Sequence, residues 1–386
     1  MSKFFKIIFV SFLIGLITGA FSSGFLHSLD WVTSLRKTHS YLIWGLPFFG
    51  LALGMFIQRM PHHVNQGVPN IIKQVESDEG QLSPWMAPFQ FITSLGTHLY
   101  GGSAGREGVG VIMGASLAQI LNSSKFKLDN LRQFLIYGGI AAGFSSIFGT
   151  PLAAIVFAFE IHSFKNIRRT YLILCVIAAS YSALIVPKLL GPVHQSYEVI
   201  FSFQDVIPYL LIAGVAAGLG AQIFYWGVRS YTQLTSKLLP SLPIRLFIGA
   251  LLISTLVYLT SGYPYIGIGT DIIARSFTQE MSWYDFAMKV LLTTMTLSIG
   301  FKGGEVTPLF FMGSTLSNWI CSIFSFRNFG LSSSLGMVGL FGAATGTPFA
   351  SILMSCELFG WKVGLCSVVS CLIARVLMGK RSVYRH

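Results

Sequence analysis

Two long stretches without a charged side chain constrain what this chain can fold into. Residues 170–186 and residues 206–228 contain no aspartate, glutamate, lysine or arginine, and most of their side chains are apolar. A helix needs about 20 residues of this kind to cross the hydrocarbon core of a bilayer. Inside that core, only a helix or a closed barrel bonds all of its backbone polar groups. These stretches therefore predict membrane-spanning helices.

The composition extends this prediction to the whole chain. Of the 386 residues, 53% are hydrophobic and 10% are charged, whereas a soluble domain carries about 25% charged residues. We therefore expect an all-α polytopic membrane protein, in which one transmembrane domain (residues 1–386) contains roughly a dozen or more helices, some of them too short to span the bilayer. Because the last apolar run ends close to His386, no C-terminal soluble domain is expected.

The charges and the cysteines exclude several classes of protein. The net charge of +12 is typical of lysines and arginines on cytoplasmic loops, and no basic tract interleaves with aromatic residues as in nucleic-acid binding. Lys3 and Lys6 precede an apolar run, as in a signal peptide, but the rest of the chain is equally apolar, so we predict an uncleaved first helix. The cysteines lack metal-ligand spacing and are predicted to be packing residues in the membrane: Cys175, Cys321, Cys356, Cys366 and Cys371.

Residues 100–114 are rich in glycine and contain two charged residues, Arg106 and Glu107. A carboxylate inside an apolar segment is costly and usually functional. Glycines let a ligand approach the backbone closely. A helix that begins near Gly105 or Glu107 offers free N–H groups and a positive dipole end to an anion. We therefore predict a pore or transporter for a small anion, with Glu107 as a built-in competing anion at its gate.

Two ordered matches indicate that the chain contains an internal duplication. Residues 109–114 align with residues 308–313, at an offset of 199 (313 − 114). Residues 149–155 align with residues 346–352, at an offset of 197 (346 − 149). Because both matches occur in the same order at nearly the same offset, they indicate a duplicated half rather than chance similarity.

Duplicated halves are a common plan of secondary transporters, in which short or broken helices meet near the middle of the bilayer. Here the halves are expected to span about residues 1–188 and 204–386. The corresponding glycine-rich interruptions, at residues 105–108 and 303–307, are the best sequence pointer to the binding site. Two helix starts would then act on one anion.

These segments resemble the CLC family of chloride channels and proton-coupled anion antiporters. Residues 105–108 resemble its glycine–basic–glutamate–glycine signature, residues 303–308 its second filter segment and residues 65–69 its first. Residues 379–384 resemble the segment that carries the pore tyrosine. Because the resemblance covers nearly the whole chain, it implies the CLC-type fold of two internally repeated halves with short and broken helices, and a homodimer with one pore per subunit.

Three departures from the usual CLC pattern resemble the fluoride-exporting branch of the family. Ile161 replaces the inner proton glutamate that directly follows the match to Glu160, Glu305 replaces a filter isoleucine, and Gln66 stands where a serine coordinates the central anion. Members of that branch exchange fluoride for protons. The resemblance therefore implies a proton-coupled fluoride antiporter, with a chloride-selective CLC antiporter or a passive CLC anion channel as the alternative.

Two carboxylates are expected to carry gating and proton transfer. Glu107 would occupy the anion path when charged and swing away when protonated; the alternative is a buried pair with Arg106. Glu305 would relay protons or contact the anion in the filter; the alternative is a solvated loop acid beside Lys302. The resemblance favours the functional role for both.

The resemblance also implies a set of anion-binding residues. Thr307 either donates its hydroxyl to the anion or only caps a helix, and a shift of the alignment by one residue would replace Gln66 with Asn65. Tyr384 is either an inner-gate donor or a surface tyrosine. The expected set is Gln66, Gly105, Arg106, Gly108, Val109, Val306, Thr307 and Tyr384.

Other ionisable groups are expected to be structural. Glu160 and Glu357 each follow the proline of a repeated segment by nine residues (160 − 151 and 357 − 348), so both are expected to bond at a helix end. His98 and His162 are expected to be satisfied structural histidines, and the pair of histidines at 62–63 lacks a metal partner set.

No nucleophile–base pair and no phosphate loop occur, so we expect neither enzyme activity nor a cofactor or metal. A membrane-embedded enzyme would need polar substrate groups beside Glu107, and a non-transporting scaffold would have no use for carboxylates at its glycine-rich helix starts. The expected partners are a small inorganic anion (fluoride, or chloride), protons, the lipid bilayer and a second copy of the chain. The expected location is multi-pass in a bacterial inner (plasma) membrane.

Overall fold

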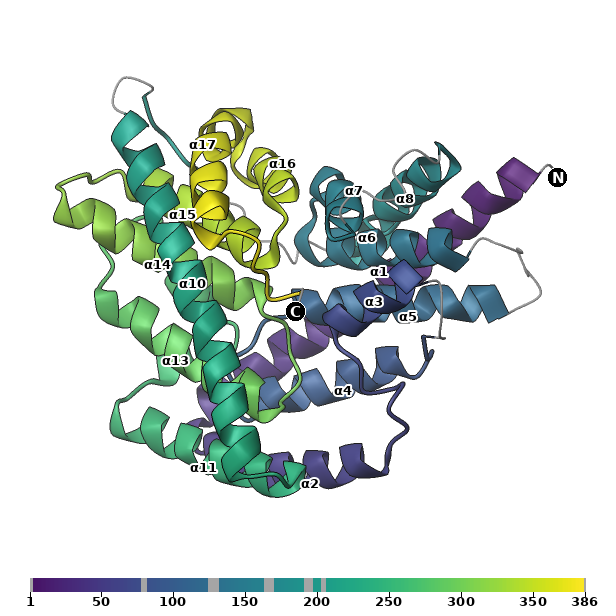
Figure 1. The fold of residues 1–386 in the computed structure, drawn as a ribbon, viewed down its shortest axis with the longest axis horizontal. Coiled ribbons are helices and arrows are strands. Elements are labelled where there is room, and N and C mark those ends of the chain that lie inside the picture. The colour runs from purple at the N-terminus through teal and green to yellow at the C-terminus, as the bar shows by residue number, and fades with distance from the viewer. Residues whose placement is uncertain are drawn as a thin grey trace. The chain divides into compact units, whose positions relative to one another are not determined.

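The structure is a computed structural model, which describes residues 3–77, 82–123, 132–162, 170–190, 197–202 and 206–384. Every regular element in these ranges is a helix (Figure 1). An isolated antiparallel bridge joins Gly105 and Gly304. The prediction of an all-α chain is confirmed.

The helices follow one another along the chain with short connections. In order they are α1 (Lys3–Thr38), η1 (Ser40–Gly45), α2 (Leu46–Arg59), α3 (Val68–Ser77), α4 (Met86–Leu99), α5 (Glu107–Ser123), α6 (Arg132–Phe148), α7 (Pro151–Glu160), α8 (Thr170–Ser182), α9 (Ile185–Leu190), α10 (Val206–Leu238), α11 (Leu242–Leu259), η3 (Tyr263–Tyr265), α12 (Thr270–Ser276), α13 (Trp283–Ile299), α14 (Val306–Ile323), α15 (Phe329–Thr345), α16 (Pro348–Phe359) and α17 (Trp361–Met378).

The helices fall into two length classes. Among the described residues, six helical stretches are long and apolar enough to cross a membrane, and they include Thr170–Leu190 and Val206–Leu238. Other apolar helices have only 10 to 17 residues, and they include Pro151–Glu160 and Phe329–Thr345. This mixture of long and short apolar helices is what the sequence predicts for a multi-pass bundle.

The first helix is longer than its apolar run. The apolar run that follows Lys6 ends at about Phe25, but α1 continues to Thr38. The extension buries Leu26, Leu29 and Val32, which are 0%, 0% and 4% exposed. These residues recur every three positions, which is the spacing of one face of a helix. The extension is therefore amphipathic, and a search for apolar runs alone does not detect it.

The connection from 261 to 279, expected to be irregular, contains two short helices, η3 (Tyr263–Tyr265) and α12 (Thr270–Ser276). Helix α13 begins at Trp283, three residues before its apolar run, because Ser282 and Asp285 form a capping box. The Ser282 side chain accepts from the N–H of Tyr284, and the Asp285 carboxylate accepts from the N–H of Ser282. Such reciprocal bonds satisfy donors that a helix start leaves free.

Contacts divide the chain into two compact units. The first unit comprises Met1–Asp30, Met60–Ile92 and Glu107–Gln195, and the second comprises Trp31–Arg59, Thr93–Arg106 and Ser196–His386. The second unit thus takes segments from both ends of the chain, and within it α2 lies beside α11 (Figure 1). The division into sequence halves at about 1–188 and 204–386 stays a prediction.

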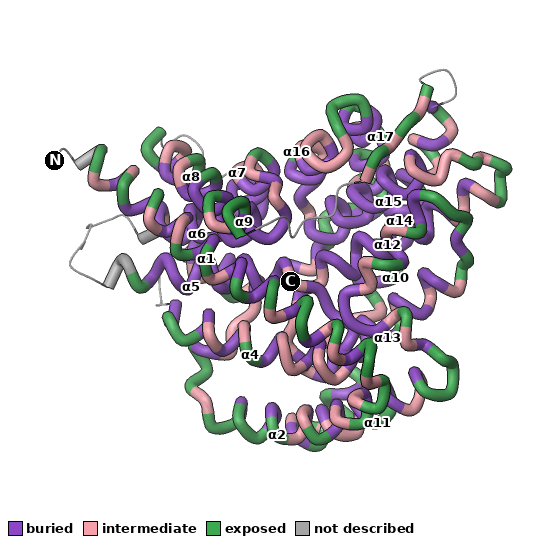
Figure 2. Tube along the Cα trace, turned by 180° about the vertical axis from the view of Figure 1, so that it is seen from behind, coloured by how far each residue is buried: buried purple, intermediate pink, exposed green. Residues whose placement is uncertain are grey.

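Each unit contains one copy of the same close helix contact. In the first unit a methyl group added at Gly114 of α5 would lie 2.0 Å from the carbonyl oxygen of Gly139 in α6. In the second unit a methyl group at Gly313 of α14 would lie 2.2 Å from the carbonyl oxygen of Gly336 in α15. Small residues allow backbones to approach this closely. Helix α15 is buried from Leu331 to Thr345, as Figure 2 shows.

The two proline-started helices are also alike. Helices α7 and α16 begin at Pro151 and Pro348, a position where the missing N–H of proline costs nothing. Each follows a glycine in the left-handed region, with φ of 75° at Gly149 and 78° at Gly346. The internal duplication predicted from the sequence is therefore present in the backbone as well as in the residues.

Candidate functional site

The glycine-rich stretch up to Arg106, which belongs to the second unit, leads along the chain into α5, the helix that begins the last segment of the first unit. Glu107 is the first residue of this helix, and it is 1% exposed. Gly108 and Val109 follow it in the first turn and are also buried. The first N–H groups of a helix have no partner within the helix, and they carry the positive end of its dipole. Glu107 therefore stands, enclosed by protein, at a place that favours negative charge.

In the second unit, α14 begins with a related arrangement. Glu305 occupies the N-cap position with φ −91° and ψ −21°, and its side chain makes no capping bond. Val306 and Thr307 are the first two helical residues and are 1% and 4% exposed. Because Glu305 holds the N-cap position, Thr307 does not, so the alternative of Thr307 as the cap residue does not apply.

Backbone hydrogen bonds join the loops that lead into these two helix starts. The N–H of Gly105 donates to the carbonyl oxygen of Gly304 at 2.6 Å, and the N–H of Gly304 donates back to Gly105 at 2.7 Å. A methyl group added at Gly303 would lie 2.3 Å from the Cβ atom of Ala104. All of these residues belong to the second unit. The structure therefore brings together Gly105 and the segment that carries Glu305.

Side chains from α13 and α4 anchor the loop in front of Gly105. The N–H of Ser103 donates to Oγ1 of Thr296 at 3.1 Å, and the Ser103 hydroxyl lies 2.9 Å from Oγ1 of Thr293. Nε2 of His98 lies 3.0 Å from the carbonyl oxygen of Ala104. His98 is therefore a structural histidine, as predicted. It contacts the loop directly.

Two buried cations that the sequence analysis missed support the same loop. Lys289 is 0% exposed; its ammonium group donates to the carbonyl oxygens of Tyr265 at 3.1 Å and Gly267 at 2.7 Å. The N–H of Gly267 donates to Gly102. Arg36, 6% exposed, donates to the carbonyl oxygen of His98 at 2.6 Å. The signal for Lys289 was present, because a cation in an apolar helix is a functional pointer.

Lys302 lies two residues before Gly304 in the loop between α13 and α14. Lys302 is half-buried.

Gln66 precedes α3 in the first unit. Its Oε1 accepts from Nε2 of Gln74 at 2.6 Å, and its carbonyl oxygen lies 3.4 Å from Nε2 of Gln90. Among the described residues, the Gln66 amide nitrogen therefore keeps its N–H groups for another acceptor. At the neighbouring position, Oδ1 of Asn65 is buried and has no protein donor in that part of the chain. The choice between Gln66 and Asn65 as the anion donor stays a prediction.

Tyr384 is 3% exposed, which excludes the alternative of a surface tyrosine. The residues before it are held by the end of α15: the N–H of Val383 donates to Ala344 at 2.8 Å, and the Ser382 hydroxyl donates to Thr345 at 2.7 Å. These bonds fix the backbone that presents Tyr384 within the second unit.

The residues around Glu160 are also buried. Glu160 is the last residue of α7 and is 5% exposed, and Ile161 directly after it is 1% exposed. Nδ1 of His162 lies 3.0 Å from the carbonyl oxygen of Ala158. The apolar side chain of Ile161 thus fills the position at which the usual CLC pattern has the inner proton glutamate.

A family model described as "Voltage gated chloride channel" matches residues 49–379. The chain belongs to this family, the CLC family. A chloride/fluoride channel protein of Pseudomonas syringae pv. tomato is 34% identical to this CLC protein over 386 residues, covering 96% of this chain and 84% of that protein. The prediction of the family is confirmed.

Solved CLC structures have the same fold. The crystal structure of a CLC-type fluoride/proton antiporter is similar with a TM-score of 0.89 and 30% identity, covering 100% of this chain and 98% of that one. A slow cyanobacterial Cl−/H+ antiporter is similar with a TM-score of 0.83 and 20% identity, covering 97% and 94%. This CLC protein is therefore a multi-pass membrane protein with the CLC fold, and its relatives include anion channels and anion/proton antiporters.

Proposed function

We propose that this CLC protein exchanges fluoride for protons and exports fluoride across a bacterial plasma membrane. The observation that carries the proposal is Glu305, a carboxylate at the N-cap of α14 in the filter segment. A carboxylate there repels a loosely held anion when charged and donates a hydrogen bond when protonated. Fluoride is a compact, strongly hydrated and basic anion, so it gains most from such a donor.

In this proposal Glu107 is the gate. Its carboxylate lies at the positive end of α5, where an incoming anion competes with it. When Glu107 is charged, it occupies the anion path; when it takes up a proton, its affinity for that position falls and it moves away. Each cycle of competition thus links one carboxylate protonation to one anion movement.

The anion is expected to contact the backbone of the glycine-rich loops and a few donors. Gly108 and Val109 line one helix start, and Val306 and Thr307 line the other, with the Thr307 hydroxyl as a donor. Gly105 supports the first helix start but offers no donor to the anion, because its N–H donates to Gly304. Gln66 contributes its amide N–H groups and Tyr384 its phenolic O–H at the inner gate. Arg106, next to Gly105 in the chain, supplies positive charge.

We expect two copies to assemble as a homodimer in which each subunit has its own pore. The exposed apolar side chains of the long helices, such as Trp361 at 64% and Leu365 at 58% on α17, are available to lipid or to a second copy. Light scattering of the purified protein in detergent, corrected for bound detergent, measures the mass. A mass of twice 42.3 kDa is the expected result.

Transport in liposomes tests the proposal. Purified protein is reconstituted in vesicles loaded with fluoride or chloride, and each anion is followed by an electrode and protons by pH. Fluoride efflux far above chloride efflux, with opposing proton movement, is the expected result. Chloride flux equal to or above fluoride flux would assign the protein to the chloride antiporters, and fluoride flux without proton movement would assign it to the channels.

A further inference from the structure

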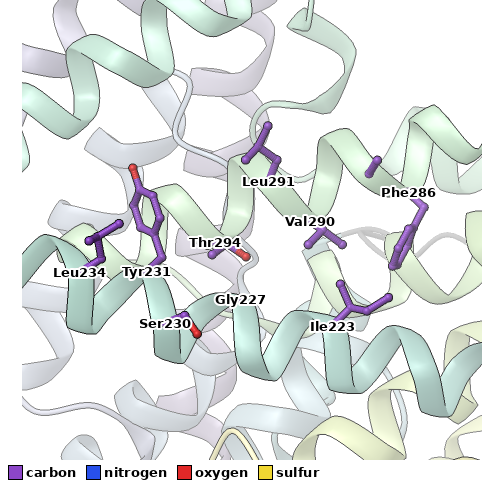
Figure 3. Close-up of a pocket in the computed structure, with 10 residues that line it drawn as sticks. Ile223, Gly227, Ser230, Tyr231, Leu234, Phe286, Val290, Leu291 and Thr294 are labelled. Atoms are coloured by element: carbon purple, nitrogen blue, oxygen red, sulfur yellow. The ribbon is translucent and has the colours of Figure 1, made fainter.

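A groove of about 480 Å³ runs between α10 and α13 of the second unit (Figure 3). Apolar side chains form most of its walls. Ile223 and Leu234 from α10 are each 51% exposed, and Leu291 from α13 is 43% exposed. In a multi-pass membrane protein, an exposed apolar wall on membrane-embedded helices faces the hydrocarbon chains of lipid.

The groove is mostly apolar, and its two ends differ only by the Tyr231 hydroxyl (Figure 3). Ile223 and Phe286 lie at the apolar end, Leu234 and Tyr231 lie at the other end, here called the polar end, and Thr294 lies between the two ends. Thr294 is 6% exposed, and its Oγ1 is buried without a hydrogen-bond partner among the described residues. A buried hydroxyl without a partner costs free energy that a ligand oxygen would recover. The groove therefore suits an amphipathic ligand.

Positive charge gathers at the polar end. Between residues 206 and 259 the sequence contains no aspartate or glutamate, and its only cations are Arg229, Lys237 and Arg245. Lys237 follows Leu234 of the groove by three residues. Nε of Arg245 donates to the carbonyl oxygen of Ile299, at the end of α13. The polar end of the groove is thus also basic and free of acidic residues on α10 and α11.

The same end of the second unit carries another cation. A methyl group added at Gly54 of α2 would lie 2.5 Å from Cα of Pro243, so the end of α2, at Arg59, lies near the start of α11. Lysines and arginines concentrate on the cytoplasmic side of membrane proteins. This bias therefore predicts that the polar end of the groove faces the cytoplasmic leaflet, whose surface is rich in anionic lipid.

We propose that this groove binds one acyl chain of an anionic phospholipid from the cytoplasmic leaflet. The chain lies along Ile223, Val290 and Leu291, the ester oxygens lie toward Thr294, and the phosphate lies at Lys237 and Arg245. Basic residues near a membrane surface attract anionic headgroups, and each contributes roughly fivefold in affinity.

The position of the groove links such a lipid to the site. Helix α13 forms one wall with Val290 and Thr294, and another of its faces holds the loop before Gly105 through Thr293 and Thr296. A lipid that packs against α13 therefore acts on the helix that positions the glycine-rich loop. This consequence, a change in transport rate, rests on the proposed function, whereas lipid binding does not.

Photolabelling tests the binding. The full-length protein in vesicles of neutral phosphatidylcholine receives a small fraction of phosphatidylglycerol with a diazirine in its acyl chain, and labelled peptides are mapped by mass spectrometry. We expect labelling around Ile223, Val290 and Leu291 well above that at Leu251 and Leu252 of α11, which are 41% and 53% exposed outside the groove. Equal labelling of groove and α11 would overturn the proposal.

Filling the groove provides the matched test. A methyl group at Gly227 would have only Thr294 within 4 Å, at 3.3 Å from its Oγ1, so Gly227→Phe places a ring in the groove. Gly24→Phe is the control, because a methyl group there meets nothing within 4 Å. Groove labelling should fall to the α11 level in Gly227→Phe and stay unchanged in Gly24→Phe. Unchanged labelling in Gly227→Phe contradicts the proposal.

The headgroup has a separate test. Lys237→Gln should lower the preference for labelled phosphatidylglycerol over labelled phosphatidylcholine by about fivefold, and Lys237→Arg should preserve it. Equal labelling by both lipids in the wild type would overturn the anionic assignment. Cross-links between two copies through cysteines placed at Leu234 and Leu291 would assign the groove to a second copy instead. None of these readouts depends on which anion is transported, so the proposed function is tested independently.

Discussion

The starts of α5 and α14 share one plan, but they place their carboxylates differently. Both follow a glycine-rich loop, and both helices pack against the next helix through a glycine pair. In α5 the carboxylate is Glu107, the first helical residue, 1% exposed. In α14 it is Glu305, one position earlier at the N-cap, and only partly buried. The buried glutamate is thus the first residue of its helix, whereas the glutamate that keeps some accessible surface lies one position before its helix.

This difference in burial suits the two carboxylates to different roles in the proposed function. A charged carboxylate enclosed by protein is costly unless its surroundings compensate it, so the position of Glu107 is sensitive to whether it is charged. Glu305 keeps some exposure and is suited to exchange protons without moving far. We therefore interpret Glu107 as the gate and Glu305 as the relay, and the following experiments test this distinction.

Removing the proton site of the gate should have the largest effect. Glu107→Gln keeps the size of the side chain but binds no proton, so we expect proton-coupled fluoride flux to fall about 1000-fold or to background. The measurement is simultaneous recording of fluoride and pH in proteoliposomes. Undiminished proton-coupled flux in this variant would remove Glu107 as the gate.

The same change in the relay should have a smaller effect. In Glu305→Gln the gate remains, so we expect proton movement to fall by about 100-fold while the protein stays folded. Thermal unfolding in detergent serves as the control for folding. A folded variant with full transport would contradict the role of Glu305 in the filter.

The shared plan can be tested through stability. Gly114→Ala and Gly313→Ala each force a methyl group against a backbone carbonyl oxygen, so each should lower the free energy of unfolding by about 1–3 kcal/mol. Gly24→Ala, in open space, is the matched control and should leave stability nearly unchanged. If only one of the two glycines proved sensitive, the helix contacts of the two units would not be equivalent.

The Ser103 bonds described above hold the loop before α5 to α13, and a substitution of Thr296 removes one of these bonds. Thr296→Val keeps the shape of the side chain but leaves the N–H of Ser103 without its acceptor, which costs about 1–3 kcal/mol. Thr296→Ser retains the hydroxyl and should stay close to wild type. Hydrogen exchange of residues 100–106 measures the effect, and equal protection in both variants would show that the bond does not hold the loop.

Much of the fold follows from local sequence patterns. Proline is favoured in the first turn of a helix, and α7 begins at Pro151. The duplication at an offset of about 200 residues predicts the matching helix pairs. The sequence analysis did not predict helix α12, which is short, or the second part of α1, which is amphipathic. Tertiary packing stabilises both, and neither contains a continuous apolar run.

The candidate site was predictable only where a motif carries it. Glu107 and Glu305 stand in glycine-rich runs that mark a helix start. Lys289 and Arg36 stand in no such motif, and their partners are carbonyl oxygens of residues brought close by the fold. A bond to a carbonyl oxygen leaves no trace in the identity of the residue that accepts it. Sequence patterns therefore predict the ionisable groups of the site better than the groups that hold the loops in place.

The reciprocal bonds between Gly105 and Gly304 restrict which backbone groups are free to contact an anion. Each glycine spends its own N–H and C=O on the other, so neither backbone donor is free for an anion. Under the proposed function, the anion would instead be bound by the first-turn N–H groups beyond them and by side chains. Exchange of single side chains would then change the selectivity while the joined backbone stays the same.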